Sequence, residues 1–333
     1  MKKILFAAMA ALAITSCSQN EEIDTLAQKA EINFNTAVSK TSRAVTTTTD
    51  KFNNFKVYAY THSATFDETT IGTAIINGVE FDKSGNAWSA AGDKKFYWPV
   101  SDMVSFFAYS PKNSSATFDH TTAGAPTLTY SVAEAPTDQE DLVVAQKVDQ
   151  KKSESGATSA VSLTFKHALT KVAFKVRGLG DGITYTVTKI TVNAKGDGTY
   201  TYDMTNDVLG SWVANTTNAT YTVYDTNETA LSFEGSDTTP APTANIEDLT
   251  AADKTLMLIP QSGATVKVTY SAAYTNGSTI RTSAEETITI ADTWTAGQNI
   301  IYTLVLKPGE AMDITGTLAD NWDTSTSSNA NMN

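Results

Sequence analysis

Residues 161–176 read VSLTFKHALTKVAFKV, and this stretch decides the fold class. Every second residue from Val161 to Phe165 is apolar, and so is every second residue from Val172 to Val176. Successive side chains of a strand point to opposite faces, so an apolar alternation with period two predicts a half-buried strand. The stretch therefore predicts two consecutive β-strands.

The same alternation recurs along the chain, at 32–34, 55–59, 187–192, 266–270, 288–290 and 302–306. Clusters of Gly, Asn, Asp and Ser separate the runs, and Asn276-Gly277 between two apolar alternations predicts a tight hairpin. We find no amphipathic helical segment long enough to organise a domain, and expect at most a short helix near 246–253. Short strands between such turns predict an all-β sandwich.

The length of 333 residues is enough for two cores of ordinary size. The polar stretch 146–159 is interpreted as the boundary between two β domains, which we place at 44–155 and 156–310. Residues 311–333 are left as a C-terminal tail or donor strand.

The N-terminus has the three parts of an export signal. Lys2 and Lys3 precede an apolar run over 4–14, which is too short to span a bilayer and is typical of a signal peptide. The following Ile-Thr-Ser-Cys resembles a lipobox, which predicts a signal peptide over 1–16 and lipidation of Cys17. An ordinary secretory signal followed by a chance cysteine is the alternative.

Composition excludes several classes of function. The formal net charge of −12 lacks the basic footprint of a nucleic-acid-binding protein. Cys17 is the only cysteine, so disulfides within the chain are excluded. The three histidines, His62, His120 and His167, show no metal-ligand spacing, and we expect no metal and no cofactor.

The sequence contains no Gly-x-Ser-x-Gly elbow, no phosphate-binding Gly-x-x-x-x-Gly-Lys and no His-Glu-x-x-His, and we expect no enzymatic activity. The acidic cluster Asp138, Glu140 and Asp141 is interpreted as a solvated loop rather than a cation site. The aromatic-rich region 97–109 is interpreted as core, because its apolar residues alternate as in a strand; sugar stacking is the alternative.

Several segments, in order along nearly the whole chain, resemble the fimbrillin family, the subunits of the Bacteroidales type V pilus. The matching segments are INF (32–34), TSRA (41–44), FKVYAY (55–60), FYWP (96–99), VSFFAYSP (104–111), DLVVA (141–145), LTFKHALTKV (163–172), LMLIPQ (256–261) and WTAGQNIIY (294–302).

The resemblance implies two tandem transthyretin-like β-sandwich domains and assembly by proteolysis. In that family the subunit is exported as a lipoprotein. An Arg-specific protease at the outer membrane then removes the N-terminal segment with its first strand, and a strand of another subunit fills the groove. The family pattern places cleavage between Arg43 and Ala44, so that 17–43 is a tether and propeptide carrying a first strand over 32–37. Arg43 lies in a Ser- and Thr-rich stretch, which has the composition of an accessible loop.

The C-terminal tail is the candidate donor. Met312, Ile314, Leu318 and Trp322 fall on even positions and share one face of an extended strand. The alternative is that the tail is the last strand of its own second domain.

The sequence thus favours a fimbrial shaft subunit at the outer membrane and cell surface. Its expected partners are other pilus subunits, the Arg-specific protease, the outer membrane through the lipid before processing, and a host or bacterial surface ligand, with no nucleic acid. The alternatives are a pilus anchor or tip subunit, a surface-anchored glycan-binding lipoprotein and, least favoured, a hydrolase on a β-sandwich scaffold.

Overall fold

The computed structural model describes residues 30–38, 52–152, 160–225, 229–319 and 322. These residues form strands joined by loops and four single-turn 3-10 helices, at Ala91–Asp93, Pro136–Asp138, Thr243–Asn245 and Ala252–Lys254. The expectation of an all-β sandwich is confirmed. Among the described residues, no helix is long and apolar enough to cross a membrane.

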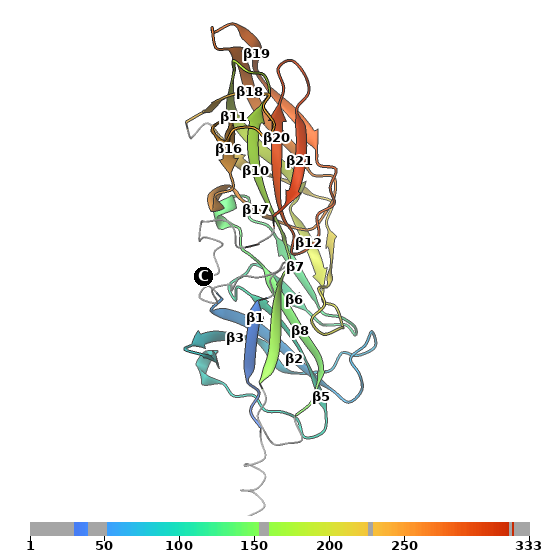
Figure 1. Ribbon diagram of the computed structural model, residues 1–333. Helices are drawn as coiled ribbons and strands as arrows, with labels where there is room; N and C mark the ends of the chain where they lie inside the picture. The colour runs from blue at the N-terminus through green and yellow to red at the C-terminus, as the bar shows by residue number, and fades with distance from the viewer. Residues whose placement is uncertain (1–29, 39–51, 153–159, 226–228, 320–321, 323–333) are drawn as a thin grey trace, which may run out of the picture.

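One half of the molecule is built on a seven-stranded sheet (Figure 1). Its order is β1 (Phe34–Val38), β9 (Val161–His167), β8 (Val143–Gln150), β5 (Met103–Ser110), β2 (Asn54–His62), β3 (Thr73–Ser84) and β4 (Ala87–Ala90). The two edge strands, β1 and β4, contact each other, so the sheet curls around its own apolar face.

The other half packs two five-stranded sheets against each other (Figure 1). The first contains β16 (Ile246–Leu249), β10 (Thr170–Gly178), β20 (Asn299–Leu306) and β21 (Asp313–Leu318), with β17 (Leu256–Leu258) paired to β10. The second contains β14 (Asn218–Tyr224), β11 (Ile183–Lys195), β18 (Thr265–Tyr274) and β19 (Thr279–Thr289), with β15 (Leu231–Glu234) paired to β11.

A four-stranded sheet joins the halves. It runs β13 (Ser211–Ala214), β12 (Asp197–Thr201), β7 (Thr127–Ser131) and β6 (Thr117–Asp119), so strands from before and after the polar stretch 146–159 pair with each other. In addition, β9 begins after residue 155 but pairs with β8 and β1 in the first sheet. The domain bounds inferred from the sequence stay a prediction.

β2 and β5 lie in the middle of the first sheet and are buried on both faces. Phe55 and Phe106 point into the core enclosed by the curled sheet, together with Phe34 and Phe165. Phe107, on the opposite face, belongs to the larger core that continues into the second half. A strand buried on both faces is apolar at consecutive positions, which explains the run VSFFAY at 104–109.

Two local expectations have opposite outcomes. The hairpin at Asn276-Gly277 is confirmed, since it joins β18 to β19 and Gly277 has a φ of 87°. The short helix expected near 246–253 is wrong for its first half, because Ile246–Leu249 form β16, and only a single 3-10 turn follows at Ala252–Lys254. The edge of β10 supplies backbone partners for that segment, with Leu249 opposite Phe174.

Candidate functional site

The first strand of the fold, β1, is an edge strand of the seven-stranded sheet. It runs parallel to β9, with Phe34 opposite Val161 and Val38 opposite Phe165. The two strands lie far apart in the sequence, so the pairing is a long-range contact that chain connectivity does not impose. The observed strand starts and ends close to the expected 32–37.

The residues just before β1 are bound by a second segment. The Ile32 amide donates to the Phe96 carbonyl at 2.8 Å, and the Trp98 amide donates to the Ala30 carbonyl at 3.0 Å. An ion pair of 3.1 Å between Lys95 and Glu31 lies beside them and raises the pKa of Lys95. Residues 30–38 thus occupy a groove between the segment 96–98 and β9.

Phe34 is buried in this groove among aromatic rings. Its ring makes edge-to-face contacts with Phe55, Phe81 and Phe106, at centroid distances of 5.8, 5.0 and 5.7 Å. Edge-to-face pairs add about 0.5–1.5 kcal/mol beyond the burial of area. Ile32, two residues earlier, is also buried, whereas Asn33 and Asn35 are exposed. The groove therefore buries the apolar side chains of Ile32 and Phe34, on alternate positions of the strand that fills it.

The other N-terminal site residues predicted from the sequence lie outside the described residues. These are Cys17, the predicted lipidation site, and Arg43 and Ala44, the predicted cleavage site. All three stay predictions.

The C-terminal tail lies in its own half of the molecule. β21 pairs antiparallel with β20, with Ile314 opposite Leu304 and Leu318 opposite Ile300. Met312 and Trp322 are buried and Ile314 is half-buried, but the Leu318 side chain is 65% exposed. Of the four predicted donor residues, Ile314 and Leu318 thus lie in an edge strand of this chain's own sheet, and Met312 and Trp322 flank that strand. Their donor role stays a prediction.

Trp322 ends the described part of the tail in a buried polar cluster. Its indole Nε1–H donates to Asp141 Oδ2 at 2.9 Å, and its ring stacks on His167 with centroids 4.1 Å apart. His167 Nδ1 lies 2.9 Å from Asp141 Oδ1, and Lys171 Nζ donates to the Trp322 carbonyl at 2.7 Å.

The interpretation of the acidic cluster as a solvated loop is therefore wrong for Asp141, which is 2% exposed. The physical reason is that contacts with His167 and Trp322 offset the cost of burying the Asp141 carboxylate. Both partners are distant from Asp141 in the sequence. Glu140 is partly buried, and that burial raises the pKa of its carboxyl. No sequence signal joined these residues, because their spacing matches no motif.

A second polar cluster contains a histidine and a serine in contact. His62 Nε2 lies 2.8 Å from Ser105 Oγ, and His62 Nδ1 lies 2.6 Å from the Ala64 carbonyl. The carbonyl can only accept, so Nδ1 carries a proton, and in the neutral imidazole Ser105 then donates to Nε2. Ser105 is fully buried, with the amide of Asp149 also donating to its Oγ.

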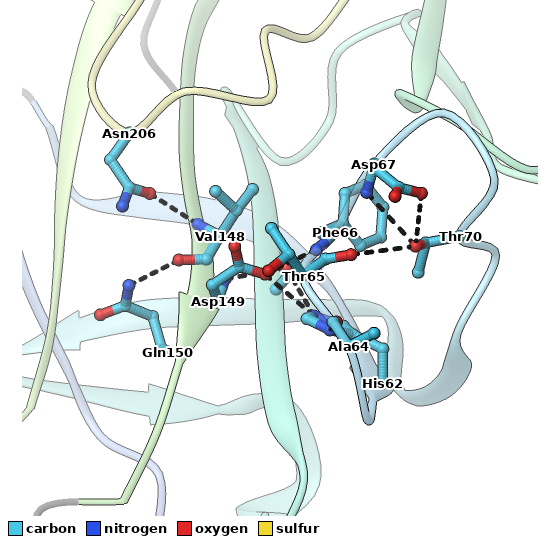
Figure 2. Close-up of polar contacts among 11 residues, drawn as sticks. His62, Ala64, Thr65, Phe66, Asp67, Thr70, Val148, Asp149, Gln150 and Asn206 are labelled. Carbon is cyan, nitrogen blue, oxygen red and sulfur yellow. Dashed lines mark hydrogen bonds and ion pairs between the residues drawn. The ribbon is translucent and has the colours of Figure 1, made fainter.

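This cluster fixes the loop after β2 against β8. Figure 2 shows Asp149 beside His62 and Phe66, and the Phe66 amide donates to Asp149 Oδ1 at 2.8 Å. The amide of the preceding residue, Val148, donates to Asn206 Oδ1 of the β12–β13 loop at 2.6 Å (Figure 2). The geometry accounts for His62 as a structural residue. Among the residues that the structure describes, no group of three or more His, Asp or Glu side chains could hold a metal ion.

A family model described as fimbrillin-like matches residues 42–322. Among solved structures, a fimbrial protein from Bacteroides vulgatus is similar, with a TM-score of 0.56 and 19% identity over 88% of this chain and 99% of that one. A candidate cell adhesion protein from Bacteroides ovatus has a TM-score of 0.50 and 14% identity, over 88% of this chain and 97% of that one. No functionally curated protein matches the chain.

Proposed function

Because the chain belongs to the fimbrillin-like family, a family of fimbrial and adhesion proteins of the cell surface, we propose that it is a pilus shaft subunit assembled by strand exchange. The observation that carries the proposal is the groove around residues 30–38. These residues include the edge strand of the seven-stranded sheet, and they are held by the segment 96–98 on one side and by β9 on the other.

Cleavage between Arg43 and Ala44 would separate β1 from the rest of the chain, since β1 ends at Val38. The other two arginines lie within paired strands. Arg177 is in β10, and Arg281 is in β19, where it stacks 4.2 Å from the Tyr270 ring. Backbone in a strand ladder resists proteolysis, whereas exposed loops do not. The placement of Arg177 and Arg281 thus favours Arg43 as the target of an Arg-specific protease.

Loss of β1 would leave the edge of β9 and the aromatic pocket uncovered, a state that soluble proteins avoid. A strand from a second copy of this chain would restore both contacts by β-augmentation.

The tail has the side-chain pattern of the strand it would replace. The segment 32–38 reads INFNTAV, and 312–318 reads MDITGTL. Both have apolar residues at the first, third and seventh positions and a small residue at the fifth. In this register Ile314 of the second copy would take the position of Phe34.

The first test is cleavage of the full chain by an Arg-specific protease. We expect a new N-terminus at Ala44 and a ladder of oligomers on a sizing column, while Arg43→Ala stays intact and monomeric. A chain cut at Arg43 that loses residues 30–38 and remains monomeric would overturn strand exchange.

The second test separates donor function from folding. Leu318 is 65% exposed in the free subunit, so Leu318→Asp should leave the monomer stable but block oligomers after cleavage. Thr317→Asp is the matched control, because Thr317 is exposed on the opposite face of the same strand. Equal oligomer formation by both variants would show that the tail is not the donor.

Lipidation of Cys17 completes the proposal as a device for delivery to the outer membrane. The lipid would leave with residues 17–43 on cleavage. The mass of the surface-exposed mature protein checks this: we expect a chain that begins at Ala44 and carries no lipid. A lipidated chain that begins at Cys17 would instead identify an anchor subunit or a surface binder.

A further inference from the structure

The cluster around Trp322 joins the end of the tail to the opposite half of the molecule. Asp141 lies two residues before β8, and His167 is the last residue of β9; both strands belong to the seven-stranded sheet. Trp322 follows β21 of the other half. Of the contacts described for Trp322, the hydrogen bond to Asp141 and the stacking on His167 therefore cross between the halves.

The cluster is buried enough for these contacts to be energetically significant. Asp141, His167, Lys171 and Trp322 are between 2% and 5% exposed. Both oxygens of the Asp141 carboxylate are engaged, one by His167 and one by Trp322. Removal of the indole would leave Asp141 Oδ2 without this donor in a buried site, which is costly for a charged acceptor.

β21 itself makes few side-chain contacts that could hold it. Of its six residues only Ile314 is partly buried, and the rest are exposed. The buried side chains stand at either end of the tail, Met312 before the strand and Trp322 after it. The tail is therefore a strand held by its backbone ladder and by its two ends.

The same strand, β9, carries both β1 and the cluster. Val38 of β1 lies opposite Phe165, and His167 is two residues farther along β9. Val161, Leu163, Phe165 and His167 are the buried, alternate residues of this strand. Any loosening of β9 after loss of β1 would therefore reach the ring on which Trp322 stacks.

From this arrangement we propose that Asp141, His167 and Trp322 form a clasp that keeps the tail on its own subunit while β1 is in place. The clasp prevents premature exchange of the tail, and departure of β1 weakens it through β9. Its role in assembly rests on the proposed function, but the contact itself does not.

The test measures hydrogen exchange by mass spectrometry on the full chain, without protease. Trp322→Ala removes the hydrogen bond to Asp141 and the stacking on His167. Trp322→Phe keeps a ring over His167 but removes the indole N–H. Leu318→Ala is the matched control in the same tail. We expect the amides of 313–318 to exchange about tenfold faster or more in Trp322→Ala, with Trp322→Phe between it and the wild type.

Exchange of β18 serves as the internal reference for global unfolding. Equal exchange of 313–318 in Trp322→Ala and Leu318→Ala would overturn the clasp. The link through β9 is tested by Phe34→Ala, which weakens β1 in the uncut chain, against Asn35→Ala. We expect exchange of 313–318 to rise roughly threefold or more beyond any rise of β18 exchange, in Phe34→Ala alone. A rise of 313–318 no larger than that of β18 would overturn the link.

Oligomer formation after cleavage is a separate readout. Faster exchange of 313–318 in Trp322→Ala, together with a wild type that never forms oligomers after cleavage, would support the clasp and refute the proposed function. Oligomers that form equally fast in wild type and Trp322→Ala, with equal exchange of 313–318, would refute the clasp and preserve the proposed function.

Discussion

β1 and β21 are both short edge strands, of five and six residues, but the structure holds them differently. β1 runs parallel to β9 and inserts Phe34 among three aromatic rings. β21 runs antiparallel to β20 and keeps most of its side chains in solvent. β1 is thus retained by side-chain burial and β21 by its backbone ladder and its ends. An edge strand held like β21 can leave its sheet with a smaller loss of core packing than one held like β1.

The largest expected effect concerns the aromatic pocket. Phe34→Ala should lower the free energy of unfolding by about 3–5 kcal/mol, because a buried ring is lost and a cavity remains. Urea unfolding measures the change, and Asn35→Ala, an exposed neighbour on the same strand, should be close to neutral. A small effect of Phe34→Ala would mean that β1 is no more tightly held than β21.

The next effect tests how closely β21 packs on the neighbouring strand. A Cβ on Gly316 would lie 2.7 Å from the Tyr302 ring and 2.8 Å from the Asp292 carboxylate, so Gly316→Val must displace one of them. We expect a loss of about 1–3 kcal/mol in unfolding free energy, typical of overpacking. Thr317→Val is the control, because the Thr317 side chain is exposed. Equal stability of the two variants would show that β21 does not pack closely on Tyr302.

A smaller effect is expected at the exposed end of β21. Leu318→Ala should change the unfolding free energy by less than about 0.5 kcal/mol, because the side chain is 65% exposed. Thermal unfolding of the uncut chain checks this. A loss comparable to that of Phe34→Ala would remove the difference between the two strands.

The smallest effect is expected for the ion pair beside β1. Lys95 is 61% exposed at its side chain, and exposed pairs contribute little to stability. Glu31→Gln should therefore leave unfolding unchanged within error and independent of salt concentration. A salt-dependent loss of stability would show that charge, and not only burial of Phe34, retains β1.

Much of the fold was predictable from local pattern. The period-two runs and the Asn276-Gly277 turn became strands and a hairpin, because both depend on interactions between near neighbours in the sequence. Residues 246–249 form a strand and not the expected helix, because the edge of β10, a distant partner, decides their structure. The Asp141–His167–Trp322 cluster was missed for the same reason, because a local sequence pattern does not indicate contacts between residues that are distant in the sequence.

The sequence by itself determined the all-β class, the alternating face of the tail and the family to which the chain belongs, because each depends on residue order. Only the tertiary structure decided that β1 lies parallel to β9, that Asp141 is buried, and that Met312 and Trp322 are covered while Leu318 is exposed. The physical reason is that alternation defines which side chains share a face. What covers that face depends on segments brought together by folding.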